Sequence, residues 1–268
     1  MPSASETAPA VAPPATAPYA VKIEDVSVTY RMSLERRPTL KGRLTRRELG
    51  VREIEAVKNV SFEVPRGKVM GVMGANGAGK STLMRAISGI VPPTRGRIEV
   101  VGKVSTLLAL GVGFNRDISG RENVVLGGLA AGLTRDQLRA KYEEIVEFAE
   151  LEDFMDMPMR AYSSGMYGRL GFSVAVNLDP DVLVVDEALS VGDARFKRKS
   201  FEKMRSLCSE NRTIVLVSHS LGAILDLADE AVWMHKGELK MIGETREVVD
   251  AYADFLGVKE DAVTLEDV

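Results

Sequence analysis

The sequence predicts an α/β fold in which helices pack on a largely parallel β-sheet, and three observations indicate it. Two apolar runs, 181–187 and 212–219, have the pattern of buried strands and are separated by a helical segment, and strands joined in this way pair in parallel. A third apolar run, 68–74, leads through a glycine-rich turn into another helical pattern. A long helical middle, 119–178, interrupts this alternation and ends at Asp179-Pro180.

Composition limits the class of protein. The chain has 268 residues, of which 45% are hydrophobic and 27% are charged, the balance of an ordinary globular protein. Its formal net charge of −3 gives no pull toward nucleic acid, so no nucleic-acid partner is expected. The single cysteine, Cys208, excludes an internal disulfide and fits a reducing compartment. No apolar run reaches the roughly 18 residues of a membrane span, so a membrane role would depend on a partner.

The remaining segments follow the same patterns. Strands are predicted at 21–30, 56–64, 97–102 and, as a hairpin, 230–243, and helices at 80–90, 196–210 and 245–256. The basic stretch 32–53 has no clear period and is expected to be a long loop or short helices. Residues 1–19 are rich in alanine and proline without the pattern of a signal peptide, and residues 258–268 are acidic. Both ends are therefore expected to be disordered tails.

A phosphate-binding loop is the strongest motif in the chain. It fits the pattern G-x-x-x-x-G-K-[ST] between a strand and a helix, and it consists of Gly74, Ala75, Asn76, Gly77, Ala78, Gly79, Lys80 and Ser81. Glycines let backbone N–H groups turn toward phosphate oxygens, and the N-terminus of the helix adds its dipole. The Lys80 ammonium balances the charge of the β- and γ-phosphates of ATP, and the Ser81 hydroxyl can bind Mg²⁺. Thr82 is included among the expected nucleotide contacts.

Two further strands are predicted to end in polar side chains near this loop. Asp186 and Glu187 follow the run VLVV, and by themselves they fit a surface turn equally well. Beside a phosphate loop, Asp186 becomes a candidate Mg²⁺ ligand, and Glu187 can align or deprotonate the attacking water. His219 ends the run IVLVSH, where it either hydrogen-bonds the γ-phosphate or is structural, whereas His235 is expected to be structural. The expected catalytic residues are Glu187, His219 and Lys80.

The order of these motifs resembles that of ABC-transporter ATPases. The run Tyr162-Ser163-Ser164-Gly165-Met166 stands at the place of the LSGGQ signature and opens a helix, and Ser190-Val191-Gly192-Asp193 resembles the D-loop. The resemblance covers roughly residues 21–245. It implies a P-loop NTPase fold of the ABC-ATPase type, with a RecA-like parallel-sheet core, an antiparallel β subdomain and a helical subdomain at about 112–178, within a domain spanning 20–257.

Longer strings resemble a narrower group, the ABC ATPases that export bacterial polysaccharides such as O-antigen, teichoic acid, capsule and lipid-linked galactan. These strings are YSSGM followed by RLGFSVAV, and GVGFNRDISGREN at 111–123. The likeness implies ATP hydrolysis at the cytoplasmic face of the cell membrane, a polytopic permease dimer as partner and a lipid-linked polysaccharide as cargo. Export of a lipid, drug or peptide, and a soluble ABC ATPase, remain alternatives. A small-molecule kinase is disfavoured because it needs neither signature nor D-loop.

The resemblance also implies a head-to-tail dimer of two copies. Ser163, Ser164 and Gly165 of one copy would complete the ATP site that Lys80 of the other copy holds, and Asp193 of the D-loop is expected to contact that site as well. Taken alone, the three signature residues fit a simple helix cap equally well.

Three features depart from the family pattern or stay open. The family has a glutamine after the strand near 104–108, and here Ala109 stands near its place. The position that stacks on adenine falls near Ile54, with Tyr30 as the other candidate. The basic stretch either lies against anionic headgroups or a lipid-linked pyrophosphate or is a solvated insertion. The family would dock its permease on the helices at 114–160.

Overall fold

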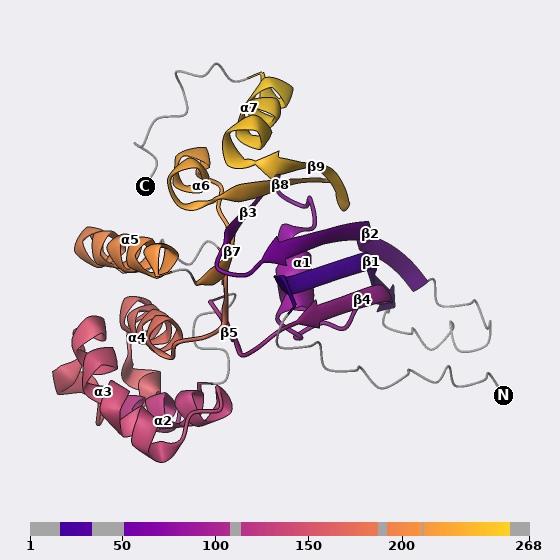
Figure 1. The fold of residues 1–268 in the computed structure, drawn as a ribbon. Helices are drawn as coiled ribbons and strands as arrows, with labels where there is room; N and C mark the ends of the chain where they lie inside the picture. Colours follow the sequence, from indigo (N-terminus) through magenta and orange to yellow (C-terminus); the bar gives the residue numbers. More distant parts are fainter. Residues whose placement is uncertain (1–16, 34–50, 108–113, 187–191, 211, 258–268) are drawn as a thin grey trace, which may run out of the picture.

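Six strands form one sheet in the order β5-β6-β7-β3-β8-β9 in the computed structural model, which describes residues 17–33, 51–107, 114–186, 192–210 and 212–257. The strands are β3 (Val69–Met73), β5 (Val104–Thr106), β6 (Val182–Asp186), β7 (Thr213–Val217), β8 (Glu230–His235) and β9 (Glu238–Glu244). All neighbouring pairs in this sheet are parallel except β8 and β9. The predicted α/β fold with a parallel core is therefore confirmed (Figure 1).

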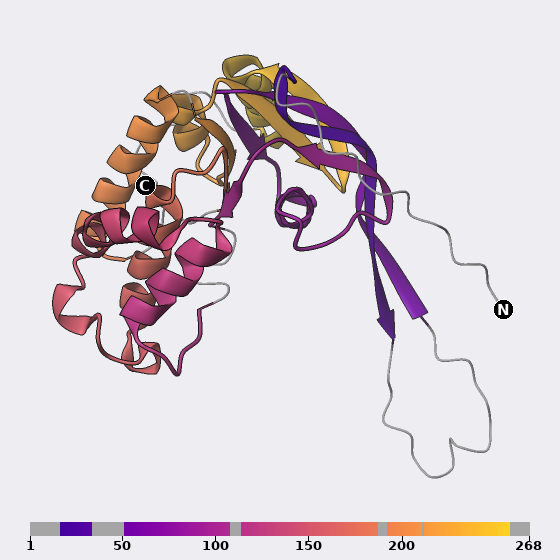
Figure 2. The same cartoon turned by 60° about the horizontal axis from the view of Figure 1, so that its bottom comes forward.

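A second, antiparallel sheet lies beside the first one (Figure 1). Its order is β2-β1-β4, with β1 at Tyr19–Ser33, β2 at Val51–Pro65 and β4 at Arg95–Val100. The prediction of a loop or short helices at 32–53 is wrong at both ends, because Met32 pairs with Arg52 and Ser33 pairs with Val51. These strand ends extend away from the rest of the protein and have no core to cover, which explains why they show no hydrophobic alternation (Figure 2). Residues 34–50 lie outside the described part.

Among the described residues, four helices follow strands of the six-stranded sheet, and three lie between β5 and β6 in the sequence. The first group is α1 (Lys80–Ile87), α5 (Ala194–Ser209), α6 (Leu221–Leu227) and α7 (Thr245–Leu256). The second is α2 (Gly120–Ala130), α3 (Arg135–Ala149) and α4 (Ser164–Asn177), with 3₁₀ turns at Glu152–Phe154 and Met159–Ala161. Capping boxes headed by Ser119 and Thr134 start α2 and α3. Among the described helices, none is long and apolar enough to cross a membrane.

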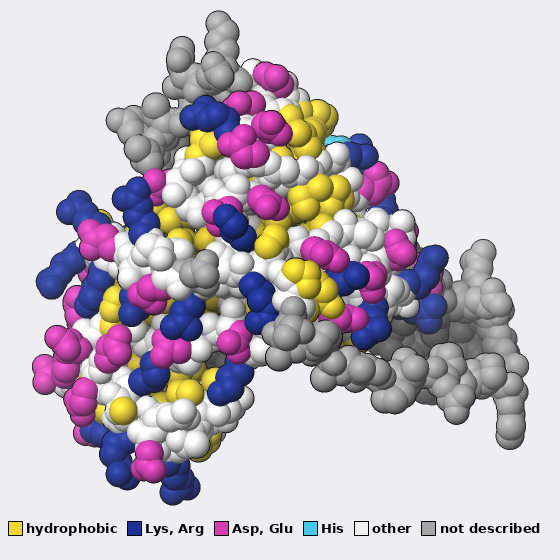
Figure 3. Space-filling model, in the orientation of Figure 1, with side chains coloured by type: hydrophobic (Ala, Val, Ile, Leu, Met, Phe, Trp, Pro, Cys, Tyr) yellow, Lys and Arg dark blue, Asp and Glu magenta, His cyan; other side chains and the backbone are white. Residues whose placement is uncertain are grey.

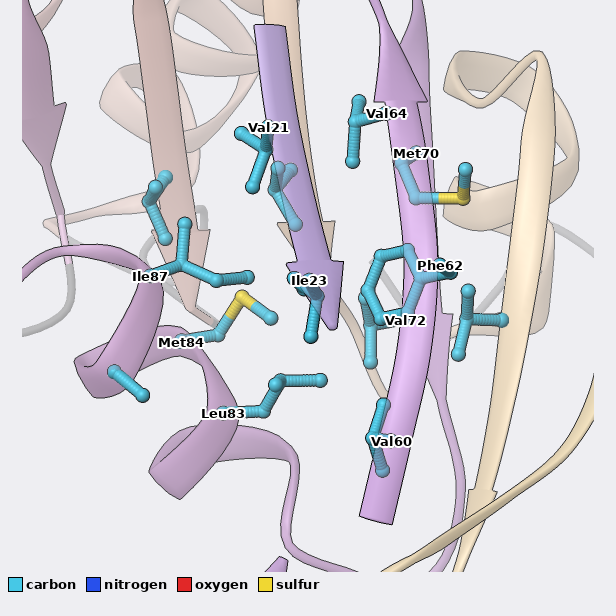
Figure 4. Packing of buried hydrophobic residues seen from close by; sticks show 14 of the residues in the cluster. Val21, Ile23, Val60, Phe62, Val64, Met70, Val72, Leu83, Met84 and Ile87 are labelled. Atoms are coloured by element: carbon cyan, nitrogen blue, oxygen red, sulfur yellow. The ribbon is translucent and has the colours of Figure 1, made fainter. Parts of the chain in front are cut away.

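Alternation along the strands divides the interior into two layers. Met70 and Val72 of β3 face the antiparallel sheet and α1, whose Leu83 and Met84 complete that cluster (Figure 4). Val69 and Met73 of the same strand belong instead to the cluster on the opposite face, to which α4, α5, α6 and α7 contribute. Each central strand is thus covered on both faces, as expected for parallel strands that read as continuous apolar runs.

Helix α4 belongs to two cores at once. Its Phe172 and Val176 pack in the cluster under the parallel sheet, whereas its Leu170 and Val174 pack in a separate cluster with α2 and α3. Every residue from Leu170 to Asn177 is buried. The predicted limits of the domain and of its helical subdomain stay predictions, and the tails at 1–16 and 258–268 lie outside the described residues.

Candidate nucleotide-binding site

The loop at 74–81 joins β3 to α1, and close backbone contacts fix its shape. Gly74 has φ 142° and Gly79 has φ 101°, both in the region that glycine tolerates best. A Cβ atom on Gly74 would clash with the carbonyl oxygen of Met234, and one on Gly79 would clash with that of Ala56. Gly237 N–H also donates to the Ala78 carbonyl at 2.9 Å. The loop is therefore held between β2 and the turn that joins β8 to β9.

Lys80 is the buried cation of this loop. The residue is only 5% exposed. Its Nζ donates to the carbonyl oxygens of Gly74 at 2.6 Å and Ala75 at 3.2 Å. Lys80 is also the first residue of α1, so its charge and the positive end of the helix dipole lie together. Both features favour a bound anion at this place.

A cavity of about 590 Å³ opens on the loop, within the size range of small-molecule sites. Its described lining residues come from β2, the loop with α1, the end of β7 and the β8–β9 turn: Ile54, Glu55, Ala56, Asn76, Gly77, Ala78, Gly79, Lys80, Ser81, Thr82, His219, Lys236 and Gly237. The structure thus brings most of the predicted loop residues, Thr82 and His219 into one site. Lys236 was not among the predicted site residues. The glycine after it, in the predicted hairpin, is a turn signal in the sequence, and in the structure both residues have positive φ.

The two candidates for the adenine contact lie opposite each other on β1 and β2. Tyr30 pairs with Ile54 in the register of the two strands. Ile54 lines the cavity and is 39% exposed. Tyr30 packs against the buried cluster, and its hydroxyl is buried without a hydrogen-bond partner. Of the two, Ile54 is the one that faces the cavity.

Polar residues lie at or just after the ends of β6 and β7, which neighbour each other in the sheet, and β7 also neighbours β3. Asp186 is the last residue of β6 and is paired with Val217 of β7, and His219 follows β7 by two residues. Because β3 pairs in parallel with β7, these carboxyl ends lie at the same edge of the sheet as the phosphate loop. Glu187, Ser190, Val191 and the position of Ala109 lie outside the described residues.

The signature and D-loop residues begin two other helices. Ser163 is the N-cap of α4, where its hydroxyl accepts from Met166 N–H at 3.2 Å, and Ser164 and Gly165 form the first turn. Asp193 caps α5 by accepting from Phe196 N–H at 2.9 Å, and this bond holds the pKa of its carboxyl below the usual value. None of the four is among the described residues that line the cavity. Within one chain, they are separate from the nucleotide loop.

Solved structures show which fold this arrangement of strands and helices has. An ATP-binding subunit of an ABC transporter superposes with a TM-score of 0.71 at 21% identity, covering 92% of this chain and 98% of that chain. A dimeric ATP-binding cassette in a post-hydrolysis state bound to ADP and Pi has a TM-score of 0.68 at 21% identity, covering 84% and 99%. At this identity the likeness establishes the fold, which is that of an ATP-binding cassette.

Sequence comparison identifies the family. The family model described as ABC transporter matches residues 57–190, and the chain is 43% identical over 211 residues to the ABC transporter protein AbcA of Aeromonas salmonicida, covering 79% of this chain and 68% of that protein. The chain belongs to the ABC transporter family. It is also 41% identical to the O-antigen export system ATP-binding protein RfbB of Myxococcus xanthus, over 90% of this chain. The teichoic acids export ATP-binding protein TagH of Bacillus cereus is likewise 41% identical, over 89% of this chain.

The relatives are longer than the matched region. The chain spans 57% of the length of the Myxococcus xanthus protein and 43% of the Bacillus cereus protein. The resemblance to polysaccharide-export ATPases noted from the signature strings agrees with these two names.

Proposed function

We propose that this chain hydrolyses ATP to drive an ABC transporter that exports a lipid-linked polysaccharide. The observation that carries the proposal is the cavity that the buried Lys80, residues 76–81 of the loop and His219 line together at the N-terminus of α1. The relatives named for O-antigen export and for teichoic acids export support the choice of cargo. Both names include the words "ATP-binding", which fits the same site.

The residues of the site suit ATP and Mg²⁺. Gly74 and Gly79 have no room for a Cβ atom, a buried cation lies beside a helix N-terminus, and the cavity is large enough for a nucleotide. In this proposal Lys80 balances the phosphate charge, and Ser81 and Asp186 hold Mg²⁺, which would neutralise the charge that develops on the phosphates. Glu187 would orient and deprotonate the attacking water, and His219 would hydrogen-bond the γ-phosphate.

A second copy of the chain would complete each site. Ser163, Ser164, Gly165 and Asp193 lie at the N-termini of α4 and α5, away from the cavity of their own chain. The N-terminus of α4 carries a positive dipole end suited to a γ-phosphate. A head-to-tail pair would bring each of these helix ends to the ATP of the other copy, and ATP would then hold the dimer closed.

The membrane partner in this proposal is a permease at the cytoplasmic face of the cell membrane. The helical region carries exposed apolar side chains, which are Leu126 and Leu129 on α2 and Phe154 and Met157 after α3. Exposed apolar side chains at these positions support docking of a partner, because they are costly to leave in water. Dimer closure and opening would then be transmitted to the permease.

An ATPase assay with Glu187→Gln tests the enzymatic part. We expect steady turnover from the wild type, and from the variant an ATP-dependent dimer, seen by size-exclusion chromatography, with turnover lowered by a factor of about 100 or more. Normal turnover of the variant would remove Glu187 from its role. The matched control is Glu210→Gln, which caps the C-terminal end of α5 and precedes β7, the strand that His219 follows.

The cargo is tested in cells. Depletion of the protein should leave lipid-linked glycan on the inner leaflet, and tagged protein in mild detergent should co-purify with a polytopic membrane protein. Unchanged surface glycan together with a co-purifying permease would favour export of another cargo. Failure to recover a membrane protein under any of these conditions would favour a soluble ABC ATPase.

A further inference from the structure

A single carboxylate, that of Glu150, connects three helices. Its Oε2 lies 3.0 Å from Nη2 of Arg169 on α4, and its Oε1 lies 3.1 Å from Nζ of Lys199 on α5. Arg195, at the start of α5, approaches the same Oε1 at 3.7 Å. Glu150 itself directly follows α3. Figure 3 shows basic and acidic side chains interspersed over the side of the molecule where α3 and α5 lie.

The backbone at Glu150 makes this residue an unusual choice. It has φ 53° and ends α3 in the left-handed conformation, which glycine adopts at helix ends with much less strain. A glutamate at this position therefore carries a conformational cost, and both of its carboxylate oxygens bind cations of α4 and α5. The Lys199 ammonium donates to the carboxylate and holds the pKa of Glu150 below its usual value, so the group is charged at neutral pH.

The two cations also bind the end of α3 directly. Arg169 Nε donates to the carbonyl of Ala149 at 2.9 Å, and Lys199 Nζ donates to that of Phe148 at 3.0 Å. These carbonyls belong to the last turn of α3, where partners inside the helix are lacking and positive charge is favoured. The cluster of Glu150, Arg169 and Lys199 thus ties α4 and α5 to one helix end. Below, we call it the three-helix junction.

Three aromatic rings, one from each of the same helices, lie against this junction. Phe148 of α3 stacks on Phe172 of α4 with ring centres 6.0 Å apart, and Phe196 of α5 meets them edge-on at 5.8 Å and 6.0 Å. The Lys199 ammonium lies 4.7 Å from the Phe148 ring centre, and the Arg169 guanidinium 5.1 Å from that of Phe196. The ion pairs of the junction and the packing of the three rings together fix the three helices relative to one another.

The two helices held in this way begin with the residues that the dimer would use. Arg169 lies in the second turn of α4, which Ser163 caps. Phe196 lies in the first turn of α5 and donates its N–H to Asp193, and a Cβ on Gly192 would lie 3.1 Å from the Phe196 side chain. The three-helix junction therefore connects, through one turn of helix on each side, the signature segment to the D-loop.

We propose that Glu150 is a positioning residue that holds the signature segment at 163–165 and the D-loop residues Gly192 and Asp193 in the fixed relation that the ATP of a second copy requires. This inference rests on the proposed function. Glu150 would act without touching nucleotide, through Arg169 on one side and Lys199 on the other. Loss of its charge should leave ATP binding to the phosphate loop of the same chain intact and weaken the step that needs both segments at once.

The test compares Glu150→Gln with Lys203→Gln in the full chain. Lys203 pairs with Glu144 at 3.5 Å and so bridges the same helices, α5 and α3, one turn further along. For Glu150→Gln we expect kcat to fall about tenfold or more, because small misplacements of catalytic groups have large effects on rate. Affinity for a fluorescent ATP analogue should be unchanged, and ATP-driven dimerisation in the Glu187→Gln background should weaken about tenfold. Lys203→Gln should behave as wild type.

A second pair of variants separates positioning from simple loss of stability. Lys199→Arg keeps the charge and should retain most of kcat, whereas Lys199→Gln should match Glu150→Gln. Equal kcat and equal dimerisation for Glu150→Gln and Lys203→Gln would overturn the inference, and so would a parallel loss of nucleotide affinity. Wild-type protein without ATPase activity would contradict the proposed function instead. An active wild type with an equally active Glu150→Gln variant would contradict only the positioning role.

Discussion

The Nζ of Lys80 lies 2.6 Å from the carbonyl oxygen of Gly74, at the opposite end of the phosphate loop. This hydrogen bond joins the two ends of the loop, and Nζ makes a second bond to the carbonyl oxygen of Ala75 at 3.2 Å. The ammonium is therefore held against the first two residues of the loop. A nucleotide would meet a site whose charge and backbone need little rearrangement, which lowers the cost of binding.

Lys80→Met should remove the stabilisation that ATP confers. At a free ATP concentration of 100 times Kd, the wild type should gain about 2.7 kcal/mol in the free energy of unfolding, since ligand binds only the folded state. The variant should gain almost nothing, because the apolar side chain cannot balance phosphate charge. Thermal unfolding with and without ATP and Mg²⁺ measures the difference. Lys240→Met, at an exposed pair with Glu238, is the control, and an ATP-induced shift equal in both variants would contradict the assignment.

Gly79→Ala should destabilise the loop and abolish nucleotide binding. The new Cβ would clash with the Ala56 carbonyl, and φ is 101°, so strain and displacement combine to a loss of about 2 kcal/mol or more in the free energy of unfolding. Gly89→Ala is the matched control, since Gly89 has φ 70° but open space around its Cβ. It should lose only about 1 kcal/mol and bind ATP normally. Denaturant unfolding with nucleotide titration checks both, and similar losses in the two variants would exclude the predicted clash.

The pH dependence of stability should reveal the Glu150 carboxylate. Its pKa is lower in the folded protein than in the unfolded chain, so the unfolded chain binds the proton more readily and the stabilisation is present above the unfolded pKa of about 4.3. It is lost as the pH falls through the folded pKa. Wild type should therefore exceed Glu150→Gln in stability at neutral pH, and the two should converge in acid. Urea unfolding across this range measures the difference, and a gap that stays constant with pH would count against the ionic contribution.

Phe172→Ala should cost about 3–5 kcal/mol in the free energy of unfolding, because the ring is fully buried between Phe148 and Phe196 and its loss leaves a cavity. Phe255→Ala, on α7 at 55% exposure, removes the same side chain from the surface and should cost far less. Chemical denaturation of both variants compares them. A small loss for Phe172→Ala would mean that the neighbouring rings collapse into the space.

Ser119→Ala should weaken the start of α2 by about 1 kcal/mol, because the Ser119 hydroxyl accepts from Glu122 N–H, while the Glu122 carboxylate accepts from Ser119 N–H. Ser209→Ala at the far end of α5 is a control whose hydroxyl bonds a carbonyl in the last turn. The equilibrium unfolding midpoint gives the difference, and a loss at Ser209 as large as at Ser119 would argue against a specific capping effect.

The parts of the fold that depend on local sequence could be predicted closely. The phosphate loop, the helix that follows it and the strands that end at Asp186 and near His219 each carry their signal within a few residues. The helix α6 was missed because its seven residues are too few for a hydrophobic period to be recognised. The strand ends at 32–33 and 51–53 were missed because the basic stretch that contains them shows no hydrophobic alternation in the sequence.

Contacts between distant residues could not be read from the sequence. Glu150 stands in an acidic stretch of the sequence, and its partners Arg169 and Lys199 are 19 and 49 residues further along the chain. Nothing local distinguishes it from the neighbouring glutamates of α3. Lys236 reaches the cavity only because β8 pairs with β3 and places the hairpin turn against the loop. Such juxtapositions come from the topology of the sheet, which no single segment encodes.

The sharing of α4 between two hydrophobic clusters has a consequence for how the protein unfolds. Helices α2 and α3 bury their apolar faces against a helix whose other side is part of the core of the sheet. Opening of α2 or of the N-terminal end of α3 disrupts only the cluster that these helices share with α4. Displacement of α4 disrupts both clusters. The amide protons of α4 should therefore exchange with solvent only through global unfolding, in a cooperative unit that includes the strands around the nucleotide loop.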